Sequence, residues 1–175
     1  MPKSAASLAL SIAILAVLPD ARAQDGTPPQ VAGVPAPAPW TPRTGDAWLD
    51  TWMLDFNRYA ARHHDAFVDE IVRYQGGPRA LVEELLAEQR WQPADVYLAC
   101  AAALALGRAC REVAAERGRD PAEDWSALLA RLQTRDGAPP LQRVRLGLVA
   151  SYDRWARPIT LDAALRRALP ERAGN

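Results

Sequence analysis

The sequence predicts an all-α fold: a single orthogonal multi-helix domain of about eight short helices, with one disulfide across a helix–corner–helix. Three observations support this prediction. From Asp46 onward, apolar residues recur every three or four positions, which is the period of a helix buried on one face. Prolines and glycines divide the chain into stretches near the usual helix length of roughly 11 residues. Segments with strand character are scarce. We therefore expect one α-helical domain over residues 45–175.

The first residues of the chain are expected to direct export. Lys3 precedes an apolar run over residues 8–18, and a small-x-small triplet at residues 21–23 stands just before Gln24. This is the pattern of a cleavable secretory signal peptide. The apolar run is shorter than the roughly 20 residues that a membrane span needs. We expect a signal peptide over residues 1–23, a periplasmic or secreted location, and no membrane span in the mature protein.

Residues 24–44 are expected to form a proline-rich, disordered linker. Prolines recur through this segment, so it cannot form a helix and buries little surface. Trp40, near its end, is placed to dock on the folded domain.

Basic and acidic residues balance in the chain, with 21 of each. A neutral chain lacks the positive surplus that drives nucleic-acid binding, so we expect no nucleic-acid partner.

The first three helices are predicted from caps and apolar faces. A helix begins after Asp46, Asp65 is placed to cap a second one, and Gly76 with Gly77 ends it. Pro78 stands where the first position of a third helix tolerates proline. The inward side chains are expected to be Trp48, Trp52, Met53, Phe56 and Tyr59, then Phe67, Val68, Ile71 and Val72, then Leu81, Val82, Leu85 and Leu86.

The most apolar helix is predicted to begin at Pro93 and to end at Gly107, with a short helix following over residues 109–117. Asp120 and Glu123 have the spacing of a capping box and predict another helix start. That helix is expected to bury Trp125, Leu128, Leu129 and Leu132.

The last two helices are predicted from a proline and a threonine. Pro140 begins one helix, with Leu141, Val144, Leu148, Tyr152 and Trp155 inward. Thr160 is placed to cap a short terminal helix that carries Leu161, Leu165 and Leu169.

Cys100 and Cys110 are the two cysteines of the chain. Along one straight helix, ten residues span about 15 Å, whereas a disulfide needs Cα atoms within about 7 Å. A bond between them therefore requires a bend, which Gly107 is placed to provide. Exported thiols meet an oxidising environment. Free buried thiols or a reactive pair are the alternatives, but a redox pair is more often CxxC and a metal site lacks nearby ligands. We predict a structural disulfide.

A polar cluster at the corner before the second helix is the candidate catalytic site. It comprises His63, His64, Asp65, Asp69 and Glu70. Imidazole beside carboxylate is a usable general base or metal ligand set. The His64–Asp65 pair resembles the pair of secreted phospholipases A2, but this chain lacks that family's flanking cysteine and glycine-rich calcium loop. It also lacks a spaced histidine pair such as HExxH. A solvated polar turn explains the same residues, and we expect no metal or other cofactor.

Trp91 and Trp155 are candidates for a recognition surface. They lie near Pro93 and Pro158, at the ends of predicted helices, whereas the other tryptophans fall mostly on inward faces. An exposed tryptophan at such a place indicates recognition.

Three segments resemble a group of small exported proteobacterial α-helical proteins that has no known activity. Its pattern is W-x-P-x-D-V-Y-x-A-C, then G-R-x-C, then W-x-x-[ILV]-A-x-x-L, which residues 91–100, 107–110 and 125–132 follow. Residues 152–159 are also similar to some members. Leu129 stands where the pattern has alanine, and residues 133–140 replace a Gly-x-x-Pro-Gly-Ser type loop, which leaves the path of the last helices open. The resemblance implies a small exported helical protein and no catalytic residues.

No motif in the chain meets the requirements of a known reaction class. We therefore expect an exported, non-catalytic helical protein of the cell envelope that binds another envelope or secreted protein. One alternative is an envelope hydrolase that uses the histidine cluster. The other is a carrier whose helices enclose an apolar ligand, which requires an internal cavity.

Overall fold

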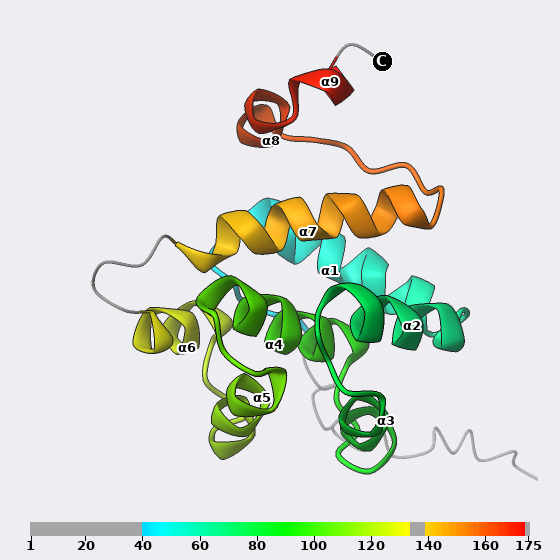
Figure 1. The fold of residues 1–175 in the computed structure, drawn as a ribbon. Helices are drawn as coiled ribbons and strands as arrows, with labels where there is room; N and C mark the ends of the chain where they lie inside the picture. Colours follow the sequence, from blue (N-terminus) through cyan, green and yellow to red (C-terminus); the bar gives the residue numbers. More distant parts are fainter. Residues whose placement is uncertain (1–39, 134–138, 174–175) are drawn as a thin grey trace, which may run out of the picture. The chain divides into compact units, whose positions relative to one another are not determined.

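The computed structural model describes residues 40–133 and 139–173. The predicted signal peptide, and the predicted linker as far as residue 39, lie outside the described residues. The described residues form α-helices and no strand, which confirms the all-α prediction. In this part of the chain no helix is long and apolar enough to cross a membrane. The helices are α1 Ala47–Ala60, α2 His64–Tyr74, α3 Arg79–Ala87, α4 Pro93–Leu106, α5 Cys110–Arg119, α6 Trp125–Leu132, α7 Pro140–Arg154, α8 Ala163–Ala168 and α9 Pro170–Ala173 (Figure 1).

Helix α4 is the centre of the core. It packs against α1, α3, α5 and α7 (Figure 1), and every residue from 94 to 103 is buried. A helix that is apolar on all sides is stable only where neighbours cover it on all sides. Pro93 stands at its start as predicted, because the first helical N–H needs no intrahelical acceptor.

The corner after α4 confirms the predicted bend and disulfide. Gly107 has φ +68°, a left-handed conformation that favours glycine. The N–H groups of Gly107 and Arg108 donate to the carbonyls of Leu104 and Ala103, which completes a Schellman cap. The chain then turns into α5, and Cys100 bonds to Cys110 with their Cα atoms 4.3 Å apart.

The disulfide is part of the core. Cys100 is fully buried and Cys110 is 4% exposed. A Cβ atom on Gly77 would lie 2.9 Å from the Cys100 Sγ and 2.7 Å from the Ile71 Cγ2. The bond therefore joins α4 and α5, and it also packs against Gly77, which precedes α3.

The inward face of α1 matches the prediction at Met53 and Phe56, but Leu49 is buried in place of Trp48, and Tyr59 is half-buried. The fully buried side chains are those of Leu49, Met53 and Phe56, whereas Trp48 and Trp52 are half-buried at the side. Tryptophans therefore border the core, where the indole of Trp48 can donate to the carbonyl of Thr160 at 2.7 Å.

Three predicted helix starts are wrong. Asp65 lies inside the first turn of α2, and His63 occupies the cap position. Asp120 accepts from the N–H groups of Ala122 and Glu123, but this closes a turn, since α6 begins only at Trp125. Asp162, rather than Thr160, caps α8 by accepting from the Leu165 N–H at 2.9 Å. Asp120 shows one reason for such errors, since a side chain that can cap a helix can also stabilise a turn.

Residues 40–44, at the end of the predicted linker, contact the domain. The Trp40 indole donates to the Asp95 carboxylate at 3.0 Å, and the buried Thr44 donates to the Asp50 carboxylate through its N–H and its hydroxyl.

Candidate functional site

The five residues of the predicted histidine cluster do not meet in one site. The exposed His63 packs its ring against Tyr59, with ring centres 4.5 Å apart, and His64 is the exposed first residue of α2. Asp65 is exposed as well. No group of three metal-binding side chains occurs within the described residues.

The two remaining carboxylates of the cluster face arginines. Asp69 pairs with Arg73 and Arg79 on the surface. Glu70 turns inward, is 3% exposed and pairs with Arg154 of α7. Guanidinium groups therefore neutralise the carboxylates that a histidine-dependent hydrolase would use.

The Glu70–Arg154 pair belongs to a buried polar network between α2 and α7. The Arg154 Nε donates to Glu70 Oε2 at 2.9 Å, and its Nη2 donates to Glu70 Oε1. The Ser151 hydroxyl donates to the same Glu70 Oε1 at 2.7 Å. The hydrogen bond to Glu70 raises the pKa of Arg154 above its ordinary value. Two-point pairing with a buried carboxylate holds the guanidinium in one orientation.

This fixed guanidinium in turn holds an exposed aromatic ring. The Arg154 Cζ lies 3.8 Å from the ring centre of Tyr74, at the last residue of α2. Tyr74 is 48% exposed, so the contact positions a large side chain at the surface. The sequence suggested no such role for Tyr74 or Arg154.

Tyr74 borders a groove between α4 and α7, of about 240 Å³. Leu104 of α4, 50% exposed, also lines it. We call it the α4–α7 groove; its lining residues are Tyr74, Gln75, Ala101, Leu104, Ala105, Arg143, Gly147, Ala150 and Arg154. Three large apolar side chains are prominently exposed in the described part of the chain, and two of them meet here.

The groove is positively charged. Arg143 and Arg154 line it, and no acidic residue does so among the residues described; Glu70 balances the charge of Arg154, so the net charge comes from Arg143. Arg143 is exposed and makes no hydrogen bond or ion pair with the described residues, so its charge is available to a partner.

Trp91 and Trp155, the predicted recognition residues, lie in two different places. Both are half-buried. Trp91 lines a hollow with Trp40, Arg117 and Pro121, beside the start of α4. Trp155 follows the end of α7 and stacks on Tyr59.

Asp95, in the segment with the family resemblance, has a structural position. It is 7% exposed and accepts from the indoles of Trp125 at 2.7 Å and Trp40 at 3.0 Å. Burial raises its pKa, and the donors oppose that rise only in part. Its carboxylate joins three segments of the chain, namely α4, α6 and the residues before α1.

Tyr97, two residues further along α4, is fully buried, and burial raises its pKa. The position of both side chains inside the domain indicates a role in the fold.

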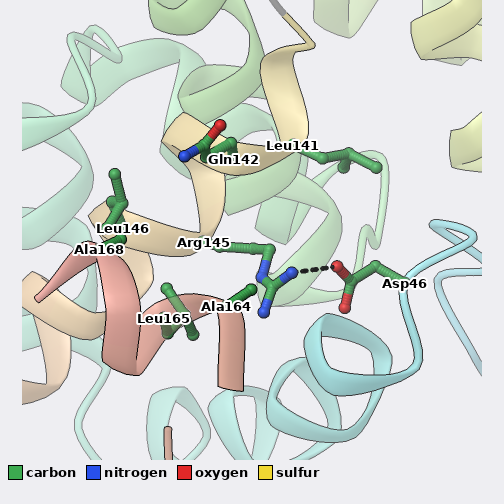
Figure 2. A pocket seen from close by; sticks show the side chains of 8 residues that line it. All are labelled: Asp46, Leu141, Gln142, Arg145, Leu146, Ala164, Leu165 and Ala168. Carbon is green, nitrogen blue, oxygen red and sulfur yellow. Dashed lines mark ion pairs between the residues drawn. The ribbon is translucent and has the colours of Figure 1, made fainter. Parts of the chain in front are cut away.

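An apolar hollow of about 250 Å³ lies between α7 and α8 (Figure 2). Leu141 and Leu146 of α7 and Leu165 of α8 line it, and the Arg145 guanidinium reaches past them to Asp46 at 2.9 Å. Small-molecule sites usually have volumes of roughly 300 Å³ or more. The volume of this hollow is therefore below the usual range for the ligand site that the carrier alternative requires.

The chain matches no protein-family model, no curated protein and no solved structure. Among the described residues, the α4–α7 groove is the place where two exposed large apolar side chains, Tyr74 and Leu104, meet.

Proposed function

We propose that the protein is an exported, non-catalytic interaction module of the cell envelope that binds an acidic segment of another envelope or secreted protein. The observation that carries this proposal is the α4–α7 groove, where exposed Tyr74 and Leu104 flank a surface whose charged side chains are all arginines. Aromatic and arginine side chains are the types that contribute most to protein–protein binding.

The floor of the groove suits a helix. Ala101, Ala105, Gly147 and Ala150 are small, so the backbone of an incoming segment can approach closely between Tyr74 and Leu104. A partner helix would place apolar residues on this floor and Asp or Glu toward Arg143, since Arg154 is already paired with Glu70. Opposite charges at the edge of an interface speed association and select the partner.

The fixed position of Tyr74 supports the proposal. Glu70 holds Arg154, and Arg154 holds the Tyr74 ring before any partner arrives. A side chain that is ordered in advance loses less entropy on binding.

The disulfide supports the proposed export. Disulfides form and persist in oxidising compartments such as the periplasm. The buried Cys100–Cys110 bond is consistent with the predicted signal peptide and with the resemblance to exported proteins.

The test is capture from the envelope fraction of the source cells with four forms of the mature protein, followed by quantitative mass spectrometry. The groove variants are Leu104→Ser and Arg143→Glu. The matched controls are Leu54→Ser and Arg167→Glu, since Leu54 is the third exposed large apolar residue and Arg167 is an exposed arginine outside the groove. We expect a protein that both controls retain and both groove variants lose by about tenfold or more, as for an interface hot spot.

The captured protein is then purified and titrated with the wild type at two salt concentrations. Binding that weakens with salt and depends on acidic residues of the partner supports the proposal. Failure of both groove variants to lose any protein overturns it. Self-association that the groove variants abolish, measured by sedimentation, identifies a second copy as the occupant and also overturns it.

A further inference from the structure

Another pocket lies where the end of α1, the corner before α2 and the segment after α7 meet, and it shares no lining residue with the α4–α7 groove. It has a volume of about 350 Å³, within the range of small-molecule sites. We call it the Tyr59–Trp155 pocket; its other lining residues are Asp55, Arg58, Arg62, His63 and Arg157.

One wall of this pocket is aromatic. The rings of Tyr59 and Trp155 are stacked, with centres 4.2 Å apart and planes inclined by 26°. The His63 ring continues this wall, 4.5 Å from the Tyr59 ring. Rings stacked on one another leave their edges for further contacts, and an aromatic edge packs favourably against the face of a flat aromatic ligand.

The corner after α7 brings a cation to this wall. Ala156 has φ +50°, and the Arg157 N–H donates to the Tyr152 carbonyl at 2.9 Å, so the chain turns back on α7. The Arg157 guanidinium thereby lies over the Tyr59 ring, with its Cζ 4.8 Å from the ring centre. A guanidinium over an aromatic face is held by electrostatic attraction to the ring.

Positive charge exceeds negative charge in the pocket. Arg58, Arg62 and Arg157 line it, against the single carboxylate of Asp55. That carboxylate is already engaged: it accepts from the Tyr152 hydroxyl at 2.7 Å, and it pairs with Arg157 at 2.9 Å and with Arg58 at 3.2 Å. One carboxylate cannot balance three guanidinium groups, so part of the positive charge of the pocket has no counterion.

Two of these arginines retain unused donors. The side chain of Arg62 makes no hydrogen bond or ion pair with the described residues, and it is exposed. The Nη1 of Arg157 is buried and has no acceptor in the described part of the chain. A buried donor without an acceptor is costly, and an oxyanion beside it would remove that cost.

We propose that the Tyr59–Trp155 pocket binds a small planar organic acid, with its ring against Tyr59 and Trp155 and its carboxylate toward Arg62 and Arg157. Ring and charge are both required by this arrangement. A simple inorganic anion does not use the aromatic wall, and an uncharged aromatic molecule leaves the arginines without a counterion. This site is independent of the proposed protein-binding groove.

The test uses three probes on the mature protein, followed by calorimetry and by NMR of the indole N–H signals. Benzoate carries the ring and the carboxylate, benzamide carries the ring without the charge, and acetate carries the charge without the ring. We expect benzoate to bind at least about tenfold more tightly than either other probe. It should shift the indole signal of Trp155, which Trp155→Phe identifies.

Arg62→Gln is the test variant, because its exposed side chain has no partner in the described residues whose loss would disturb the fold. It should weaken benzoate binding about fivefold, the value of one exposed charge contact. Arg143→Gln, in the α4–α7 groove, is the matched control and should leave benzoate binding unchanged.

Three results would overturn the inference. They are no benzoate binding in the millimolar range, benzamide or acetate binding as tightly as benzoate, and equal effects of Arg62→Gln and Arg143→Gln. None of these results affects the capture experiment, so the proposed ligand pocket and the proposed protein-binding groove are tested independently.

Discussion

Reduction of the Cys100–Cys110 bond is expected to destabilise the protein by an amount that follows from its position in the chain. The bond closes a loop of ten residues. The loop-closure relation for a crosslink of this length gives about 2.7 kcal/mol at 25 °C, mostly through restriction of the unfolded chain. For a domain of this size that is a large part of the usual 5–15 kcal/mol of total stability.

The assay is urea unfolding of the oxidised and the reduced protein, followed by tryptophan fluorescence. Reduction keeps both sulfur atoms in the core and so isolates the bond. The double variant Cys100→Ala with Cys110→Ala also loses the packing of two buried sulfurs, so we expect it to be less stable than the reduced protein. The dependence of the free energy on urea should steepen in the reduced protein, since an unlinked unfolded chain exposes more surface.

Equal free energies of unfolding for the oxidised and reduced forms would refute this reasoning. Thiol labelling provides a separate check of the bond itself. The exported protein, denatured without reductant, should show no reactive thiol, and two labelled cysteines would contradict the disulfide.

Three further changes test which contacts stabilise the fold. Gly77→Ala should lower the free energy of unfolding by about 1–3 kcal/mol, because the new Cβ would lie 2.7 Å from Ile71 and 2.9 Å from Cys100. Gly118→Ala in α5 meets no atom within 4 Å and should raise the free energy of unfolding by up to about 1 kcal/mol, and urea unfolding tests both variants. Burial raises the pKa of Asp55, but hydrogen bonds and charge from Tyr152, Arg157 and Arg58 outweigh this, so the net pKa lies below its ordinary value of 3.8. A carboxyl whose pKa is lower in the folded state stabilises the protein above the unfolded pKa and loses this contribution as the pH falls through the folded pKa. Asp55→Asn should therefore flatten the loss of stability as the pH falls below about 4, and an unchanged acid profile would count against this account.

The ends of α4 and the disulfide could be predicted from the sequence, because they depend on residues close to them in the chain. Pro93 at the start of α4 and Gly107 at its end act through backbone geometry, which the sequence shows directly. The bend at Gly107 then made the cysteine pairing predictable, since both partners lie within a few residues of it.

The residues that cap the helices were harder to predict, because two suitable capping residues can lie within a few positions of each other. Thr160 and Asp162 are both suitable cap residues. Asp162 caps α8 and also pairs with Arg145 of α7, a contact that the local sequence does not show. In the same way Trp125 begins α6 where its indole reaches Asp95, a residue 30 positions earlier.

The candidate site depends on pairings that no local pattern shows. Glu70 and Arg154 are 84 residues apart, and nothing near either residue indicates the other. Leu104 lies in a helix that is apolar on all sides, so periodicity could not show that its side remains exposed. The charge of Glu70 suggested chemistry with His64, whereas in the fold that charge orients Arg154.

The enclosure of α4 has a consequence for how the domain opens. Its backbone amides lie under α1, α3, α5 and α7, so they can exchange hydrogen with solvent only when the whole domain unfolds. The slowest exchange rates in the protein should therefore report its global stability. The short helices α8 and α9 pack mainly on each other, and their amides should exchange through local opening at lower free energy. A partner bound in the α4–α7 groove would contact the slowly exchanging unit, so its binding would slow exchange by adding to the stability of the entire core.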